Sequence, residues 1–190
     1  RRGLPLGEAL ELFIALAGAV RDVHDAGLIH KDINPASILW DGGSGRVQLL
    51  DFGLASEFKR EQAPALGANA LEGTLAYMAP EQSGRMNRPV DYRSDYYALG
   101  VVFFEVLAGR PPFEARRPLD LIHCHIAVLP PRLDQLQPQV PAPLADVVAR
   151  LLAKNVDERY QSAEGLLADL NECLSQWRRQ GRVDPFPLGR

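Results

Sequence analysis

The sequence lacks most of the features that mark secreted, membrane-spanning or nucleic-acid-binding proteins. Its two cysteines, Cys124 and Cys173, lie far apart and make no disulfide framework, which fits a reducing cytoplasm. No apolar run approaches the roughly 18 residues that a membrane-spanning helix needs. The basic N-terminus has neither the apolar core nor the cleavage site of a signal peptide. The net charge of −3 argues against nucleic acid or an anionic membrane as the main partner.

What remains is an ordinary globular composition, 46% apolar and 24% charged, over 190 residues, which suits a single domain. Apolar periodicity predicts five helices, over 7–26, 94–108, 119–128, 144–154 and 162–180. The second of these is apolar nearly all round, so we expect it to be buried. Two short strands, near 37–40 and 47–50, flank the turn sequence Asp-Gly-Gly-Ser-Gly and predict a hairpin. The expected fold is mainly α with a small β-hairpin.

The stretch from His30 to Gly53 carries the chemistry. Asp32 and Asp51 stand on either side of the predicted hairpin, so folding it back brings the two carboxylates together. Phosphoryl transfer needs one carboxylate to orient the attacking hydroxyl and another to hold Mg²⁺ on the phosphates. The order H-K-D, D-F-G and then A-P-E, at 79–81, matches the protein-kinase signature. The chain resembles the C-terminal lobe of a eukaryotic-like Ser/Thr protein kinase.

The resemblance implies roles for four residues, with ATP, Mg²⁺ and a protein substrate as ligands. Asp32 would be the catalytic base and Asp51 the main ligand of Mg²⁺. Leu39 matches the position that forms the floor under the adenine, although an ordinary place in the hairpin core would also explain it. Thr74 matches the residue that contacts the catalytic aspartate and favours Ser/Thr acceptors, although it can equally be a plain turn residue.

Five further residues have structural roles in the family. His30 and Phe52 would stack in an apolar spine. Glu81 of the A-P-E would form a buried ion pair with Arg159; the alternative is a solvated pair of little energetic value. Asp95, at the start of the apolar helix, would hold the backbone of the catalytic loop.

Two positions depart from the common Ser/Thr pattern. Asn34 stands where a lysine places positive charge on the transferring phosphoryl group, and a neutral amide should weaken that electrostatic stabilisation. Ser37 stands where an asparagine ligates a second Mg²⁺. Its shorter side chain would reach the metal only through water. These two departures favour a second reading from another class, a pseudokinase that serves as a binding or regulatory module.

Three segments, H-K-D-I-N-P at 30–35, G-T-L-A-Y-M-A-P-E-Q-S-G-R-M-N-R at 73–88 and I-H-C-H-I-A at 122–127, resemble a particular bacterial group. Those proteins join an N-terminal Ser/Thr-kinase-like domain to an ATPase module and a sensor histidine kinase, and so imply a two-component signalling context. We assign 1–180 to the kinase lobe and 181–190 to a linker or tail. The family's Gly-rich loop, its strand lysine and the helix glutamate are absent from this sequence. We therefore expect a partial kinase domain, inactive by itself, with apolar surface exposed where the N-terminal lobe would sit.

Two other features bear on regulation and metal binding. No Ser, Thr or Tyr occurs from Glu57 to Gly73, so phosphate cannot order the middle of the activation loop. We expect regulation by other means. The adjacent His123, Cys124 and His125 cannot converge on one ion if they lie on a helix, so we do not predict a metal site there.

Overall fold

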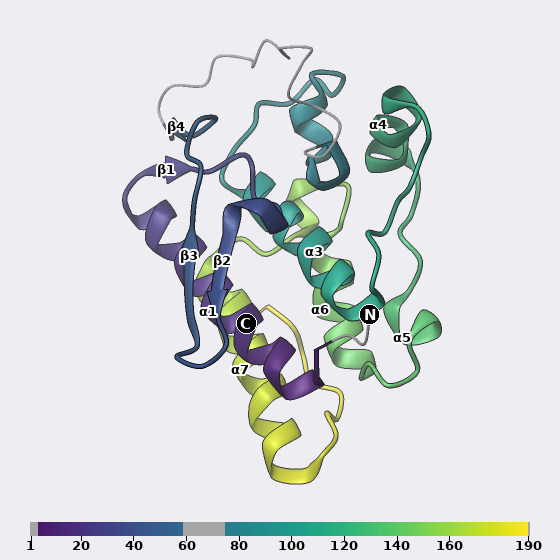
Figure 1. Ribbon diagram of the computed structural model, residues 1–190. Helices are drawn as coiled ribbons and strands as arrows, with labels where there is room; N and C mark the ends of the chain where they lie inside the picture. The colour runs from purple at the N-terminus through teal and green to yellow at the C-terminus, as the bar shows by residue number, and fades with distance from the viewer. Residues whose placement is uncertain (1–3, 59–74, 190) are drawn as a thin grey trace.

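The structure, a computed structural model, describes residues 4–58 and 75–189, and it is a helical body with a hairpin laid against it (Figure 1). Its α-helices are α1 (Leu6–Asp25), α3 (Arg93–Ala108), α4 (Pro118–Ala127), α5 (Leu133–Leu136), α6 (Ala142–Leu151) and α7 (Ala163–Gln180). Short 3₁₀ turns are η1 (Pro35–Ser37), η2 (Leu75–Tyr77), η3 (Pro80–Ser83) and η4 (Val156–Glu158). The mainly helical fold is confirmed, and the five predicted helices lie within three residues of their expected bounds.

Two small antiparallel sheets complete the architecture of the described residues. β2 (Ile38–Asp41) pairs with β3 (Arg46–Leu49), and Asp41 accepts a hydrogen bond from the Gly43 N–H in the turn between them. This is the predicted hairpin. β1 (Leu28–Ile29) pairs with β4 (Ser56–Glu57), which the sequence did not predict, because two-residue strands carry no periodicity.

The centre of the molecule is α3. Residues from Ser94 to Phe104 are all buried, as the apolar pattern predicts. The ring of Phe103 stacks on Phe13 of α1 with centroids 3.9 Å apart. α3 packs against α1, α5 and α6, and α1 packs in turn against α7 (Figure 1). The helix ends at Gly109, whose left-handed φ of 77° suits a residue without a Cβ.

The C-terminal segment turns back from α7 towards α1 (Figure 1) and packs on the body. Val183 is buried, the Leu188 carbonyl accepts a hydrogen bond from Arg150, and the Gly189 N–H donates to Asp169. This differs from the linker or frayed end expected for 181–190. The prolines on which that expectation rested exclude a helix, but they do not prevent an extended segment from packing.

His125 lies in a polar cluster inside the body, where it is 0% exposed. Lys154 Nζ donates to the Tyr97 hydroxyl (3.3 Å), which leaves that hydroxyl's proton to bond His125 Nδ1 (3.0 Å). Burial, reinforced by the charge of Lys154, lowers the pKa of His125 to about 4. Burial, reinforced by the charge of Arg159, lowers the pKa of Lys154 to about 8. The neighbouring His123 points to solvent, so these two histidines face different surroundings.

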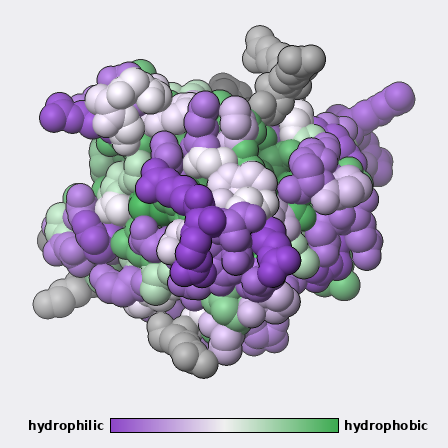
Figure 2. Space-filling model, turned by 90° about the horizontal axis from the view of Figure 1, so that it is seen from below, coloured by the Kyte–Doolittle hydropathy of each residue, from purple (hydrophilic) through white to green (hydrophobic). Residues whose placement is uncertain are grey.

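The underside of the molecule is mostly hydrophilic, with hydrophobic side chains interspersed (Figure 2). Among the helices in the described ranges, none has the length and apolar character needed to cross a membrane. In the same ranges no three His, Cys, Asp or Glu side chains gather as they would around a metal ion.

Gly100 marks the closest approach of α3 to α6 and provides a test of their packing. A Cβ at this position would lie 2.7 Å from the Leu151 Cβ and 3.1 Å from the Leu152 side chain. We expect Gly100→Ala to lower the free energy of unfolding by about 1–3 kcal/mol, since the two helices must separate. Urea denaturation measures this. The control is Gly18→Ala in α1, where nothing lies within 4 Å and the same change should stabilise. Equal effects of the two substitutions would contradict the packing argument.

The buried His125 predicts a pH dependence of stability. In the unfolded chain a histidine titrates near its ordinary pKa of about 6.5, whereas in the folded protein its pKa is about 4. Between these values the unfolded state binds more protons, so stability falls as the pH is lowered through that window, by up to about 3 kcal/mol. The midpoint of urea denaturation should therefore fall more between pH 7 and pH 5 for the wild type than for His125→Gln. The exposed His123→Gln should behave as the wild type, and identical pH dependence in all three proteins would refute this assignment.

Candidate active site

Asp95, in the first turn of α3, holds the predicted catalytic loop by its backbone. The carboxylate is 1% exposed. Its Oδ2 accepts the N–H of His30 at 2.9 Å, and its Oδ1 accepts the N–H of Lys31 at 2.8 Å. Hydrogen bonds to an ionised acceptor are roughly twice as strong as neutral ones. The loop is thus fastened to the most buried helix of the molecule, as the role expected for Asp95 requires.

A second histidine, which the sequence analysis did not single out, orients this carboxylate. His24 Nε2 lies 2.8 Å from Asp95 Oδ2, and the His24 ring packs among Phe58, Tyr92 and Tyr96. A signal for it was present in the sequence. His24 follows the buried Val20 by four residues, so it is a polar side chain on the apolar face of α1, where a buried partner is needed.

His30 connects the two predicted catalytic aspartates. Its ring is 0% exposed, and its Nε2–H donates to the carbonyl of Leu50 at 3.0 Å, directly before Asp51. Its Nδ1 accepts the backbone N–H of Asp32 at 3.3 Å. Phe52 lies against the same ring, with centroids 4.6 Å apart, so the predicted contact between His30 and Phe52 is present. One buried imidazole therefore fixes the backbone next to both carboxylates.

Two residues at the site adopt the left-handed conformation that is unfavourable for most side chains. Lys31 has φ of 67° and Asp51 has φ of 60°. Such a residue costs of the order of 1–3 kcal/mol and persists only where its surroundings enforce it. Lys31 directly precedes Asp32, and Asp51 opens the D-F-G. The backbone strain therefore lies at the two points that set the direction of the Asp32 and Asp51 side chains.

Asn34 is engaged by the loop to which it belongs. Its Nδ2 donates to Asp32 Oδ1 at 2.9 Å and to the Asp32 carbonyl at 3.1 Å, and its Oδ1 accepts the N–H of Ala36. Both amide protons thus point to Asp32. In this arrangement Asn34 orients the predicted base, and one oxygen of that carboxylate, Oδ2, is not used by the amide.

Ser37 is turned into the loop as well. It is 3% exposed, and its hydroxyl lies 2.9 Å from the Asp32 carbonyl and 3.0 Å from the N–H of Asn34. Together Asn34 and Ser37 form a reciprocal capping box around η1. The hydroxyl serves the backbone in this structure, so a metal-ligand role for Ser37 stays a prediction.

Asp51 is exposed, and among the predicted residues it has the chemistry that best fits a divalent cation. Within the described residues, the carboxylate of Asp51 accepts one hydrogen bond, a long one of 3.3 Å from the Gly53 N–H to Oδ1. Mg²⁺ commonly takes one or two protein carboxylates and completes its shell with phosphate oxygens and water. A single exposed carboxylate here fits that requirement.

Leu39 is exposed to 55%, so it is not the hairpin-core residue that was the alternative reading. Four further apolar side chains near it in the sequence, Leu50, Phe52, Leu54 and Phe58, are each more than 40% exposed.

The expected ion pair of Glu81 with Arg159 is present and fully buried. The guanidinium contacts the two carboxylate oxygens at 2.6 and 2.9 Å, and it also donates to the carbonyls of Ala153 and Arg93. It is not the solvated pair of the alternative reading. The pair fixes the A-P-E segment to α3 and to the chain around η4. Thr74 and the segment 59–73, on which the regulatory prediction rests, lie outside the described residues.

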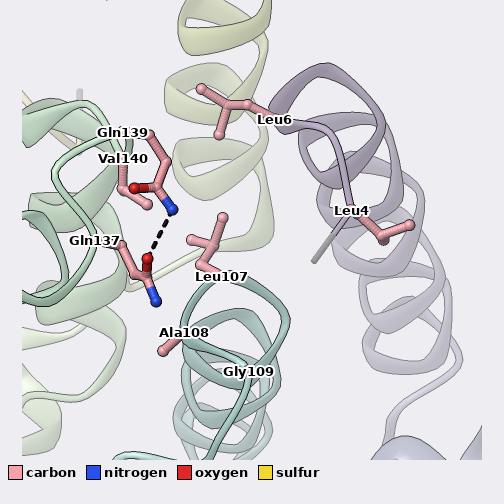
Figure 3. Close-up of a pocket in the computed structure, with 8 residues that line it drawn as sticks. All are labelled: Leu4, Leu6, Leu107, Ala108, Gly109, Gln137, Gln139 and Val140. Carbon is pink, nitrogen blue, oxygen red and sulfur yellow. Dashed lines mark hydrogen bonds between the residues drawn. The ribbon is translucent and has the colours of Figure 1, made fainter. Parts of the chain in front are cut away.

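A pocket of about 300 Å³ lies at the other end of α3 (Figure 3). Leu4, Leu6, Leu107, Ala108, Gly109 and Val140 line it together with Gln137 and Gln139, whose amides hydrogen-bond to each other at 2.7 Å. None of these eight residues is titratable or nucleophilic. The pocket lies roughly 20 Å along the helix from Asp95, given a rise of about 1.5 Å per residue, so it is separate from the candidate site.

Comparison with known proteins supplies the family. The sequence model described as the protein kinase domain matches residues 2–170. A probable serine/threonine-protein kinase of Corynebacterium efficiens is 35% identical over 173 residues, which cover 89% of this chain and 26% of the relative. The probable serine/threonine-protein kinase PknB of Corynebacterium glutamicum is 36% identical, covering 86% and 25%. The serine/threonine-protein kinase PknF of Mycobacterium tuberculosis is 36% identical, covering 84% and 33%.

This chain thus spans about a quarter to a third of the length of the curated relatives it matches. Its family match covers the loop held by Asp95, both aspartates bridged by His30 and the buried pair of the A-P-E segment. On that combined ground, the chain belongs to the protein kinase domain family.

Proposed function

We propose that this chain contributes the catalytic loop of a Ser/Thr protein kinase, which transfers the γ-phosphoryl group of Mg-ATP to a hydroxyl of a protein. The observation that carries the proposal is the bridge made by His30 between the backbone at Asp32 and the backbone before Asp51. The bridge supports the proposal because one side chain bonds to the backbone of the base candidate and to the backbone directly before the metal-ligand candidate, and the left-handed residues Lys31 and Asp51 lie at the same two points. Phosphoryl transfer needs a pair of carboxylates in these two roles.

Each residue has a task in this mechanism. Asp32 accepts the proton of the substrate hydroxyl through the oxygen that Asn34 leaves free. Asp51 holds Mg²⁺, which neutralises charge on the phosphates when it is bound. Asn34 keeps the base oriented, and Thr74 supports the acceptor hydroxyl. Leu39 gives the adenine an apolar surface. Ser37, if it takes part in metal binding, does so through water.

We further propose that the chain is the helical C-terminal lobe of that kinase. The exposed apolar side chains between Leu39 and Phe58 support this, because solvent contact of several large side chains is costly unless another surface covers them. An N-terminal lobe carrying the Gly-rich loop and lysine would cover it and bind most of the ATP. The parent would be a cytoplasmic bacterial signalling protein that also holds ATPase and sensor histidine kinase modules. Its kinase would be regulated without phosphate in the middle of the activation loop.

The alternative function is that of a pseudokinase, and one observation favours it. The amide of Asn34 and the hydroxyl of Ser37 are satisfied inside the loop, so neither is directed away from it towards a phosphate or an ion. The transfer step would then lack the cationic donor and the second metal ligand of the common pattern. Such a protein would use the same fold to bind or regulate a partner.

Phosphate transfer from radiolabelled Mg-ATP by the intact protein separates the two functions. We expect Asp51→Ala to lower the rate by at least about 100-fold, or roughly 2.7 kcal/mol of transition-state stabilisation. Asp22→Ala is the matched control, because this exposed carboxylate is paired only with the adjacent Arg21 in the described structure. It should leave the rate unchanged. Wild-type transfer no higher than that of Asp51→Ala would establish the pseudokinase instead.

The same assay tests the second metal position with Ser37→Asn. We expect a gain in rate, because a carboxamide oxygen on a longer side chain can reach an ion that the hydroxyl does not. A loss of rate would mean that the bonds from Ser37 to Asp32 and Asn34 matter more than a second ligand. Urea denaturation of the variant distinguishes such a loss from simple unfolding.

A further inference from the structure

Gln82, the residue after the A-P-E segment, makes a link to the catalytic loop that the sequence analysis did not anticipate. Its side-chain Nε2 donates to the carbonyl of Lys31 at 2.8 Å, across 51 positions of sequence. Its Oε1 accepts the N–H of Ala79 at 2.9 Å. A backbone N–H can only donate, so this bond fixes which end of the amide faces Ala79 and leaves Nε2 for Lys31.

The acceptor in this link belongs to the strained residue before the base candidate. Lys31 has φ of 67°, and its own N–H is held by Asp95. Gln82 holds its carbonyl. The two peptide groups that flank the Lys31 Cα are thereby held by two different elements, the first by Asp95 of α3 and the second by Gln82 of η3, and the second is also held through the Asp32 N–H by His30. Because the Lys31 carbonyl belongs to the peptide that leads into Asp32, fixing it sets the direction in which the Asp32 side chain leaves the backbone.

Gln82 is itself held in a rigid segment. The preceding residue, Glu81, is locked into the buried pair with Arg159. The following residue, Ser83, is buried and donates from its hydroxyl to the carbonyl of Pro80 at 2.6 Å. The backbone N–H of Gln82 bonds to the Ala79 carbonyl. A long side chain positions its partner precisely only when its own backbone is fixed, and the backbone of Gln82 is fixed by the residues on both sides.

We propose that Gln82 is a positioning residue for Asp32, which couples the order of the A-P-E segment to the geometry of the catalytic loop. The inference rests on the proposed function. When the segment around η3 is in place, Gln82 holds the Lys31 carbonyl and the base is aimed. When that segment shifts, the peptide that joins Lys31 to Asp32 is held only by the bond from the Asp32 N–H to His30, and the alignment of Asp32 loosens.

Two variants of the intact protein test the role in catalysis. Gln82→Met keeps the length and removes both hydrogen bonds, whereas Gln82→Glu keeps the acceptor for Ala79 and removes the donor to Lys31. We expect both to lower kcat by about 10- to 100-fold, as misplacement of a reacting group does, while KM for ATP stays within about twofold. Gln139→Met is the control, since this exposed glutamine bonds only to Gln137 among the described residues.

The Gln82→Glu variant offers a further readout that a merely structural role would not move. A protonated carboxyl group has a donor and an acceptor, so it can replace both hydrogen bonds of the amide. A carboxylate that faces the Lys31 carbonyl has its pKa raised, which brings protonation towards the accessible range. The rate of Gln82→Glu relative to the wild type should therefore rise at least about threefold when the pH is lowered from about 8 to 5.5. The relative rate of Gln82→Met should stay flat.

Hydrogen exchange distinguishes failure of this inference from failure of the proposed function. Exchange of the Lys31 and Asp32 amides, followed by mass spectrometry in the intact protein, should accelerate about tenfold or more in Gln82→Met. It should be unchanged in Gln139→Met. If the wild type shows no transfer that depends on Asp51, the proposed function fails, and exchange still decides the role of Gln82 in the loop. Unchanged exchange together with unchanged kcat in Gln82→Met would overturn the inference.

Discussion

The site depends on the buried carboxylate of Asp95. This residue lies in the first turn of α3, where all residues from Ser94 to Phe104 are buried, so its position is fixed by the packing of the core. The carboxylate accepts the N–H groups of His30 and Lys31 and contacts the ring of His24. A buried carboxylate without such donors would carry a large desolvation cost. The loop needs the carboxylate for its shape, and the carboxylate needs the loop for its hydrogen bonds.

The ring of His30 links the buried contact at Asp95 to the two candidate catalytic aspartates. It bonds to the backbone N–H of Asp32 and to the carbonyl directly before Asp51, so one buried ring fixes the backbone from which an exposed and a half-buried carboxylate extend. Lys31 and Asp51 keep an unfavourable left-handed conformation because these hydrogen bonds hold the backbone around them. The helical body stabilises backbone conformations that a free loop would not keep.

The residues that depart from the common kinase pattern show where sequence reasoning works and where it stops. The resemblance to the kinase family identified Asn34 and Ser37 as departures, and their chemistry predicts the loss of a charge and of a ligand. Their orientation could not be derived in that way. Short polar side chains beside a turn tend to bond to nearby backbone, and both side chains do so here. Asn34 is a residue type favoured at N-caps, and it caps η1 in the structure.

The sequence by itself determined the helices and the hairpin, because apolar periodicity and turn residues act between neighbours a few positions apart. The order of the motifs can be read directly along the chain. The pairing of Glu81 with Arg159 and of His30 with Phe52 came from the resemblance to a family and not from local pattern. Only the tertiary structure decided which distant groups complete the loop. The contacts of Gln82 with Lys31 and of His24 with Asp95 span 51 and 71 positions. They depend on how whole helices pack and which rotamers that packing leaves, and no periodicity in the sequence encodes either.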